Sequence, residues 1–432
     1  MPVATIETLV RHVRDALARG DAARAEALCR ECLALDPARE DALAFLAMRA
    51  IGRGEPASVR ALLERAAALR PDAALLHFHH GCVLEAIGAL AEARDAFERA
   101  TVADPAMLLA QFWLAEQHAA LDDPARALST AVRAVAAAER SGYGRTLAEL
   151  PADARARIDA CVARTRAGRG AVIDEALGAT ASPRVRAAFS RYLGHDSPAS
   201  SHPGQRPSFL LIPDLPARAW FERHEFPFLA AIEAETDAIR AELLDVIADT
   251  TRLTPYVDMP PDAPAAPMWS ALNRSRRWSA YHLFRHGEAI AAHTARCPAT
   301  VAALEALPLM RIAAHSPEAL YSILEPRTRI PPHTGVMNGR LTVHLPLVVP
   351  ANCGALRVAD ESRAWEAGRC LVFDDSLVHE AWNDADATRA VLIFDIWDPR
   401  LAAEERAAIA AAVAAIGRFH ARHGAYDATH EA

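Results

Sequence analysis

The chain has 432 residues, enough for two or three domains, and 52% of them are apolar and 24% charged, as in ordinary globular proteins. Its formal net charge of −8 gives no basic field that would attract nucleic acid or an anionic membrane. No apolar run reaches the roughly 20 residues that span a bilayer, so we expect neither nucleic-acid nor membrane partners.

The cysteines and the first predicted helix indicate the cellular location of the protein. The seven cysteines are an odd number, and Cys29 and Cys32 lie three apart on a predicted helix, where we interpret them as small buried residues. The first 21 residues form an amphipathic pattern with charges throughout and lack the apolar core of a signal peptide. We therefore predict a reducing, cytoplasmic location.

The first third of the chain repeats with a period of 34 residues. Two sets of turn and helix-ending residues recur at this interval: Pro37, Pro71 and Pro105, and Gly20, Gly54, Gly88 and Asp122. This period is typical of tetratricopeptide repeats, in which each unit is a pair of antiparallel helices with small residues at their contact. The pattern predicts three repeats and a degenerate fourth, ending before residue 140.

A helical composition continues beyond the repeats, and residues 140–178 are expected to cap the solenoid. Residues 194–207 are rich in Gly, Pro and Ser, which favours a linker. We therefore predict a repeat domain over 1–178, a linker over 179–207, a second domain over 208–400, and a C-terminal helix and tail over 401–432.

The second domain changes to a β pattern. One helix is expected at residues 227–249, followed by a Pro-rich loop. Short apolar stretches then alternate with turn residues: WSAYHLF, ALYSILEP, RLTVHLPLVVP, ALRVAD, CLVFDD and RAVLIFDIW. Many short strands with turn signals favour a sandwich or barrel, so the predicted fold is an all-α solenoid followed by a β-dominated domain.

Two histidines of the β region are candidate metal ligands. His333 is predicted just before a strand, and His379 just after one, 46 residues later. Neutral imidazoles suit Fe(II), whose other positions then stay open for O₂ and a co-substrate. A carboxylate two residues after the first histidine would complete the usual triad, but Gly335 occupies that position. The spacing alone therefore leaves two ordinary histidines as an open alternative.

The surrounding sequence resembles the aspartyl/asparaginyl β-hydroxylase family. The resemblance lies in the HTG–N–RL–HLPL run, the W–G–FDDS–HEAWN run and the R–LI–DIWDP ending, and it extends more weakly over residues 208–400. It implies a double-stranded β-helix, also called a jelly-roll or cupin-like fold, that uses Fe(II) and 2-oxoglutarate. In this family two histidines hold the iron and water takes the place of the carboxylate, so Gly335 matches the pattern.

The resemblance also assigns roles to single residues. His333 and His379 correspond to the iron ligands, and Arg389 to the arginine that holds the distal carboxylate of 2-oxoglutarate. Ser322, His344 and Trp278 correspond to further co-substrate contacts. A guanidinium group suits the role of Arg389 because it binds a carboxylate through two hydrogen bonds; the alternative is a surface salt bridge.

Three further positions qualify this assignment. Thr342 replaces an arginine of some family members, and Arg340, two residues earlier, is expected to take over part of its contact with co-substrate or substrate. Asp375 is expected either to order iron-bound water or a ligand histidine, or only to form the turn of the FDDS loop. Thr342 puts the identity of the substrate in doubt.

The resemblance implies hydroxylation of an Asp or Asn residue in a peptide or protein, with the repeat domain recruiting substrate or a partner. Three alternatives stay open: a hydroxylase of a free amino acid or peptidic metabolite, a halogenase, and a non-catalytic repeat scaffold. The solenoid could also serve only in self-association.

Overall fold

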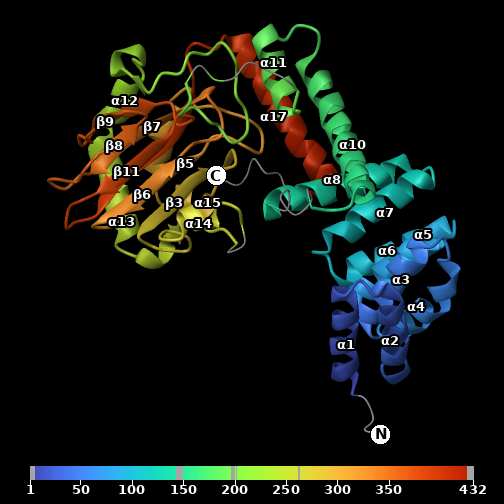
Figure 1. The fold of residues 1–432 in the computed structure, drawn as a ribbon. Coiled ribbons are helices and arrows are strands. Elements are labelled where there is room, and N and C mark those ends of the chain that lie inside the picture. The colour runs from blue at the N-terminus through green and yellow to red at the C-terminus, as the bar shows by residue number, and fades with distance from the viewer. Residues whose placement is uncertain (1–4, 143–148, 196–199, 201, 261–262, 426–432) are drawn as a thin grey trace. The chain divides into compact units, whose positions relative to one another are not determined.

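The structure is a computed structural model that describes residues 5–142, 149–195, 200, 202–260 and 263–425. The chain forms two compact units, one with the residues up to 168 and one with residues 169–422. Figure 1 shows their helices and strands and labels many of them. Each unit is described by itself below.

The first unit consists of helical hairpins. Its repeat helices are α1 (Ile6–Ala18), α2 (Ala22–Leu35), α3 (Glu40–Gly52), α4 (Ala57–Leu69), α5 (Ala74–Ala86), α6 (Leu90–Ala103), α7 (Leu108–Ala120) and α8 (Pro124–Ser141). The first helices of successive hairpins begin at residues 6, 40, 74 and 108, which are 34 apart. The predicted repeat is therefore confirmed.

Small buried residues explain why these helices pack closely. Equivalent positions of the second helices carry Ala25, Val59, Ala93 and Ala127, each at most 1% exposed. Cys29 and Cys32 are buried in the same layer, and all seven cysteines are free thiols. Within the described residues, no helix is long and apolar enough to cross a membrane.

The region between the repeats and the β domain differs from its prediction. Helix α10 (Ala152–Leu177) continues across residue 168, where the two units divide. Helix α11 (Pro183–Tyr192) lies inside the segment predicted as a linker. It buries Val185, Ala188 and Phe189 because their spacing gives the helix one apolar face. Residues 183–192 of the predicted linker are therefore helical.

The second unit contains two antiparallel sheets. In the larger sheet the strand order is β1-β10-β7-β12-β5-β3-β2, with β4 paired to β3, and in the smaller it is β6-β11-β8-β9. The strands are β1 (Trp220–Phe221), β2 (Thr254–Pro255), β3 (Trp278–Arg285), β4 (Glu288–Ala289), β5 (Ala319–Leu324), β6 (Thr328–His333), β7 (Arg340–Val348), β8 (Leu356–Val358), β9 (Glu361–Arg363), β10 (Leu371–Phe373), β11 (His379–Asn383) and β12 (Arg389–Trp397). All six predicted strands are present.

The helices of this unit are short except for the last. They are η1 (Arg223–Glu225), α12 (Leu229–Ala234), α13 (Thr236–Ile247), η2 (Thr250–Arg252), α14 (Ala266–Trp269), α15 (Ala291–Thr294), α16 (Pro298–Glu305) and α17 (Ala403–Arg422). The single helix predicted at residues 227–249 is thus two helices, α12 and α13. The predicted C-terminal helix is α17.

Alternation along the strands gives the larger sheet two different faces. One face carries Leu341, Val343 and Leu345 of β7 and packs against buried residues of α12, α13 and α16. The other face carries Trp278, Phe373 and Val391, which share a buried cluster with residues of the smaller sheet. The two sheets therefore form a sandwich, and polar residues on this second face point between them.

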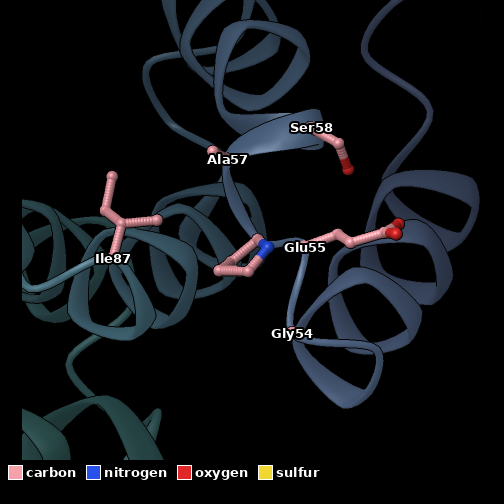
Figure 2. A pocket seen from close by; sticks show the side chains of 6 residues that line it. Gly54, Glu55, Ala57, Ser58 and Ile87 are labelled. Atoms are coloured by element: carbon pink, nitrogen blue, oxygen red, sulfur yellow. The ribbon is translucent and has the colours of Figure 1, made fainter.

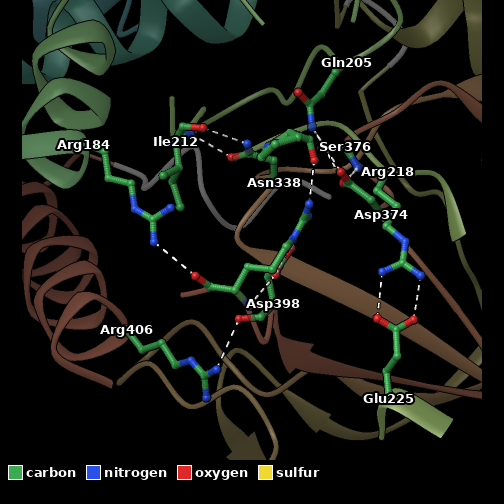
Figure 3. Close-up of polar contacts among 12 residues, drawn as sticks. Arg184, Gln205, Ile212, Arg218, Glu225, Asn338, Asp374, Ser376, Asp398 and Arg406 are labelled. Carbon is green, nitrogen blue, oxygen red and sulfur yellow. Dashed lines mark hydrogen bonds and ion pairs between the residues drawn. The ribbon is translucent and has the colours of Figure 1, made fainter. Parts of the chain in front are cut away.

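The loop before β11 is anchored by buried hydrogen bonds. Gln205 donates from Nε2 to Asp374 Oδ2 and Ser376 Oγ, both at 3.1 Å (Figure 3). Asn338 holds the chain at Ile212 through both its amide oxygen and its amide nitrogen. Burial raises the pKa of Asp374 to about 7. These contacts fix residues 374–378, which lead directly into His379.

Candidate functional site

The two candidate ligand histidines face each other across the smaller sheet. His333 is the last residue of β6 and His379 the first of β11, and the antiparallel register pairs them directly. Their ring centroids are 4.1 Å apart. His333 precedes β7 and His379 follows β10, as expected, but each is also the terminal residue of a strand that the sequence analysis did not predict. The sequence pattern missed β6 because it contains two prolines.

Each histidine is oriented by its own backbone. His333 Nδ1 lies 2.8 Å from the carbonyl oxygen of Pro331, and His379 Nδ1 lies 3.0 Å from that of Leu377. A carbonyl oxygen only accepts, so each Nδ1 carries the proton and each Nε2 keeps its lone pair. Burial lowers the pKa of His333 to about 3 and also lowers that of His379. Both rings are therefore neutral, as metal ligands must be.

Gly335 and the buried side chain of Asp375 fit together sterically. A Cβ atom on Gly335 would lie 2.2 Å from Asp375 Oδ2, far closer than atoms approach. The Asp375 carboxylate thus fills the space that a side chain at position 335 would need. Its Oδ1 atom is buried and has no hydrogen-bond partner, so it is available to a ligand or water beside the histidines.

This donor set limits which metal sites are possible. Among the described residues, no group of three or more His, Cys, Asp or Glu side chains is arranged to hold a metal ion. The two histidines alone offer nitrogen donors, with most positions of a bound ion left open. Such a set fits a catalytic ion that must bind other molecules, and it does not fit a closed structural site.

Arg340 lies between two buried carboxylates and is itself mostly buried, with 13% of its side chain exposed. Its guanidinium group donates to Asp375 Oδ2, and Nη1 lies 3.4 Å from Asp395 Oδ2. Burial raises the pKa of Asp395 to about 7. Arg340 therefore holds Asp375 in place, and a co-substrate contact stays a prediction for it. Our sequence analysis did not consider Asp395, although a carboxylate within the apolar run of β12 was a visible signal.

Arg389 has the opposite environment. It is 1% exposed, and its Nε and Nη1 atoms have no hydrogen-bond partner. Its guanidinium carbon lies 4.5 Å from the ring centroid of Trp365. Burial lowers the pKa of Arg389 to about 10. A buried cation without a carboxylate is costly, so this environment indicates a site for an anionic ligand.

The other predicted co-substrate residues lie on the same face of the larger sheet. In β12, Val391 pairs with Ser322 of β5 and Ile393 with His344 of β7. Trp278 Nε1 donates to Ser322 Oγ over 3.0 Å, which leaves the serine proton free for another acceptor. Burial, and next the charge of Arg389, hold the pKa of His344 well below its ordinary value.

The sequence analysis missed two aromatic residues, of which one packs against His333 and the other against Trp278. The ring centroid of Trp269 lies 5.0 Å from that of His333. Tyr256 stacks on Trp278 with a centroid distance of 3.8 Å. Both come from the segment before β3, where proline and alanine dominate and no periodic pattern marks them. They give the site an aromatic wall, and Thr342 faces the same inter-sheet space without adding a charge.

A hollow in the first unit differs from this site in its lining. A hollow between two repeats is lined by Gly54, Glu55, Pro56, Ala57, Ser58 and Ile87 (Figure 2). Glu55 is the single charged residue in this lining, and its side chain extends away from Ile87 in Figure 2. The lining therefore brings no groups together for catalysis or metal binding.

Sequence comparison shows which known proteins the β unit resembles. Residues 233–399 match the sequence profile described as Aspartyl/Asparaginyl beta-hydroxylase. The chain is 34% identical over 181 residues to the ornithine lipid ester-linked acyl 2-hydroxylase of Rhizobium tropici, covering 41% of this chain and 60% of that protein. It is 37% identical over 134 residues to the human aspartyl/asparaginyl beta-hydroxylase, covering 31% of this chain and 18% of that protein. The chain thus spans less than two thirds of either relative.

Solved structures resemble parts of the chain more distantly. YrrB, described as a TPR protein with an unusual peptide-binding site, has a TM-score of 0.28 at 18% identity, covering 34% of this chain and 75% of that one. A thermophilic TPR protein of Thermus thermophilus has a TM-score of 0.27 at 20% identity, covering 37% of this chain and 81% of that one. Both scores are low, and the repeat assignment depends on the helix positions given above.

Proposed function

Because residues 233–399 match the aspartyl/asparaginyl β-hydroxylase family, we propose that the chain is an Fe(II)- and 2-oxoglutarate-dependent hydroxylase. The observation that carries this proposal is Arg389, a buried arginine on the sheet face toward the histidine pair that has no carboxylate partner among the described residues. The sandwich of two antiparallel sheets supports the double-stranded β-helix expected for such an enzyme.

In this proposal His333 and His379 hold the iron through their Nε2 atoms. The iron, when bound, supplies the activation of O₂ that a hydroxylation requires. Asp375 lies over Gly335 and offers its unpaired Oδ1 to a water or ligand on the open side. Arg340 holds this carboxylate in place through its guanidinium group.

Arg389 binds the distal carboxylate of 2-oxoglutarate. Its Nε and Nη1 hydrogens are unpaired, and each lies on an edge of the guanidinium group that it shares with Nη2, where a carboxylate can accept two hydrogen bonds. The hydroxyl of Ser322 and the imidazole of His344 add neutral donors beside it, and Trp278 orients Ser322. Binding of the dianion would relieve the unpaired charge of Arg389, so affinity and specificity come from the same group.

For the substrate we propose an Asp or Asn residue of a peptide or protein, recruited through the repeat unit. A free amino acid or peptidic metabolite is the alternative within the same chemistry. The name of the Rhizobium relative adds an acyl group as a second candidate, which the aromatic wall of Trp269 and Tyr256 and the uncharged Thr342 favour. We keep the cytoplasm as the proposed location, since all seven thiols are free.

Anaerobic titration tests the iron and co-substrate sites. Fe(II) and 2-oxoglutarate are added to the protein without O₂, and the weak visible absorption of their chelate is recorded. We expect the band in the wild type, its loss in His333→Ala, and a higher half-saturating 2-oxoglutarate concentration in Arg389→Gln. A wild type without the band, or a band unchanged in His333→Ala, would overturn the assignment.

A substrate panel separates the candidates. Succinate formation is measured with Asp- and Asn-containing peptides, free amino acids and acyl lipids. Peptides are expected to raise turnover above the substrate-free rate, and deletion of the repeats is expected to weaken that stimulation. Stimulation by free amino acids alone, or by acyl lipids alone, would replace the peptide proposal with the matching alternative.

A further inference from the structure

Trp365 contacts two of the proposed co-substrate groups at once. It lies in the connection between β9 and β10 and is 5% exposed. The guanidinium carbon of Arg389 lies 4.5 Å from its ring centroid, and its Nε1 donates to Nδ1 of His344 over 3.4 Å. None of the proposed roles above uses this residue.

The hydrogen bond from Trp365 decides where His344 carries its proton. An indole N–H only donates, so Nδ1 of His344 must accept and stay unprotonated. Because burial keeps the ring neutral, its one proton lies on Nε2. His344 therefore offers a donor at Nε2, which suits an anionic oxygen, whereas the other tautomer would present a lone pair there.

The cation–π contact constrains Arg389 in a different way. A guanidinium group at the end of a long side chain needs support to hold one plane, and no carboxylate supplies it here. The guanidinium carbon of Arg389 lies over the Trp365 ring, where a cation is attracted to the π electrons. The edge hydrogens on Nε and Nη1 stay free for a ligand.

We propose that Trp365 is a positioning residue for the co-substrate: its indole N–H selects the His344 tautomer that donates from Nε2, and its ring holds the guanidinium group of Arg389 in place. The inference rests on the proposed function for the identity of the ligand. The two contacts make separate predictions, because phenylalanine keeps the ring and loses the N–H, whereas leucine loses both.

The first test reads the tautomer directly and needs no co-substrate. Nitrogen NMR of the protein labelled with ¹⁵N-histidine, assigned with His344→Gln, distinguishes protonated from unprotonated ring nitrogens. We expect His344 to be protonated at Nε2 in the wild type and to become a mixture of tautomers in Trp365→Phe. Protonation at Nδ1 in the wild type, or an unchanged spectrum in Trp365→Phe, would overturn the tautomer role.

The second test separates the two contacts by kinetics. Relative to the wild type, the KM for 2-oxoglutarate is expected to rise about threefold in Trp365→Phe and about 30-fold in Trp365→Leu, with kcat changed less than about twofold. Trp382, which lies under Arg329 with 4.9 Å to its centroid, provides the matched control. Trp382→Phe and Trp382→Leu are expected to leave the KM for 2-oxoglutarate unchanged.

The outcomes distinguish this inference from the proposed function. If Trp365→Leu has the wild-type KM, or if the Trp382 variants shift KM equally, the positioning role is overturned while the hydroxylase assignment stands. If the wild type converts no 2-oxoglutarate, the proposed function fails, and the tautomer measurement still decides whether Trp365 orients His344.

Discussion

Both units of this chain bury histidines whose pKa lies below the ordinary value, but the two sets differ in how their rings are held. In helix α5, both ring nitrogens of His80 and Nδ1 of His79 lack hydrogen-bond partners. In the β unit, His333 and His379 each bond Nδ1 to a backbone carbonyl and face each other. Burial is the largest cause of the lowered pKa in all four.

The difference shows that a lowered pKa marks burial and not function. Metal binding requires lone pairs that converge. Among these four histidines, only His333 and His379 have backbone bonds that leave two Nε2 atoms free on the same side of a strand pair. The solenoid histidines serve as packing residues between helices. Removing a histidine of the β-unit pair should therefore lower activity, whereas removing a solenoid histidine should affect the stability of the solenoid and leave activity unchanged.

The largest effect is expected from the histidine pair. His333→Ala should lower 2-oxoglutarate turnover by about 10³-fold or more, since a metal supplies several kcal/mol of the stabilisation of the transition state. The control His80→Leu should leave turnover per folded molecule unchanged. Succinate formation at saturating iron measures both, and equal losses in the two variants would remove the distinction between the units.

The two buried arginines of the site should respond oppositely in stability. Arg340→Met leaves Asp375 and Asp395 buried without their cation and should lower the free energy of unfolding by about 3–5 kcal/mol. Arg389→Met removes an unpaired buried charge and should leave that free energy unchanged or raise it by about 1 kcal/mol. Urea unfolding of the protein without iron or co-substrate measures both. A similar loss in both variants would contradict the contrast.

Acid should weaken the solenoid through its buried histidines. Burial lowers the pKa of His79 from 6.5 to about 4, so between these values the unfolded chain binds a proton that the folded chain does not. The stability that His79 contributes is therefore complete above pH 6.5 and falls by about 3 kcal/mol as the pH drops to 4. Urea unfolding followed by helical circular dichroism tests this, and His79→Leu should flatten the slope. An unchanged slope in that variant would assign the acid sensitivity elsewhere.

The smallest effect is expected from adding one methyl group at each of two glycines. Gly335→Ala would displace Asp375 and should cost about 1–3 kcal/mol in stability, together with weaker iron binding. Gly52, in helix α3, has open space around its Cβ position, so Gly52→Ala should stabilise by up to about 1 kcal/mol. Thermal unfolding compares them, and a tolerated alanine at 335 would show that Asp375 does not need that space.

Local patterns in the sequence predicted most of the architecture. The 34-residue period located the helical hairpins because each repeat buries the same small residues against its neighbours. Apolar alternation located β3, β5, β7 and β12. The sequence patterns missed β6, where two prolines hide the strand. They also missed α11, whose apolar face lies in a segment that we interpreted as a linker.

The sequence by itself thus determined the repeat, the main strands and, through motif resemblance, the residues of the candidate site. Only the tertiary structure decided which polar groups are paired. It placed Asp375 over Gly335, used Arg340 to hold it, left Arg389 without a carboxylate and set Trp365 between Arg389 and His344. The physical reason is that periodicity reports burial along one element, whereas the pairing of buried charges depends on residues that distant strands bring together.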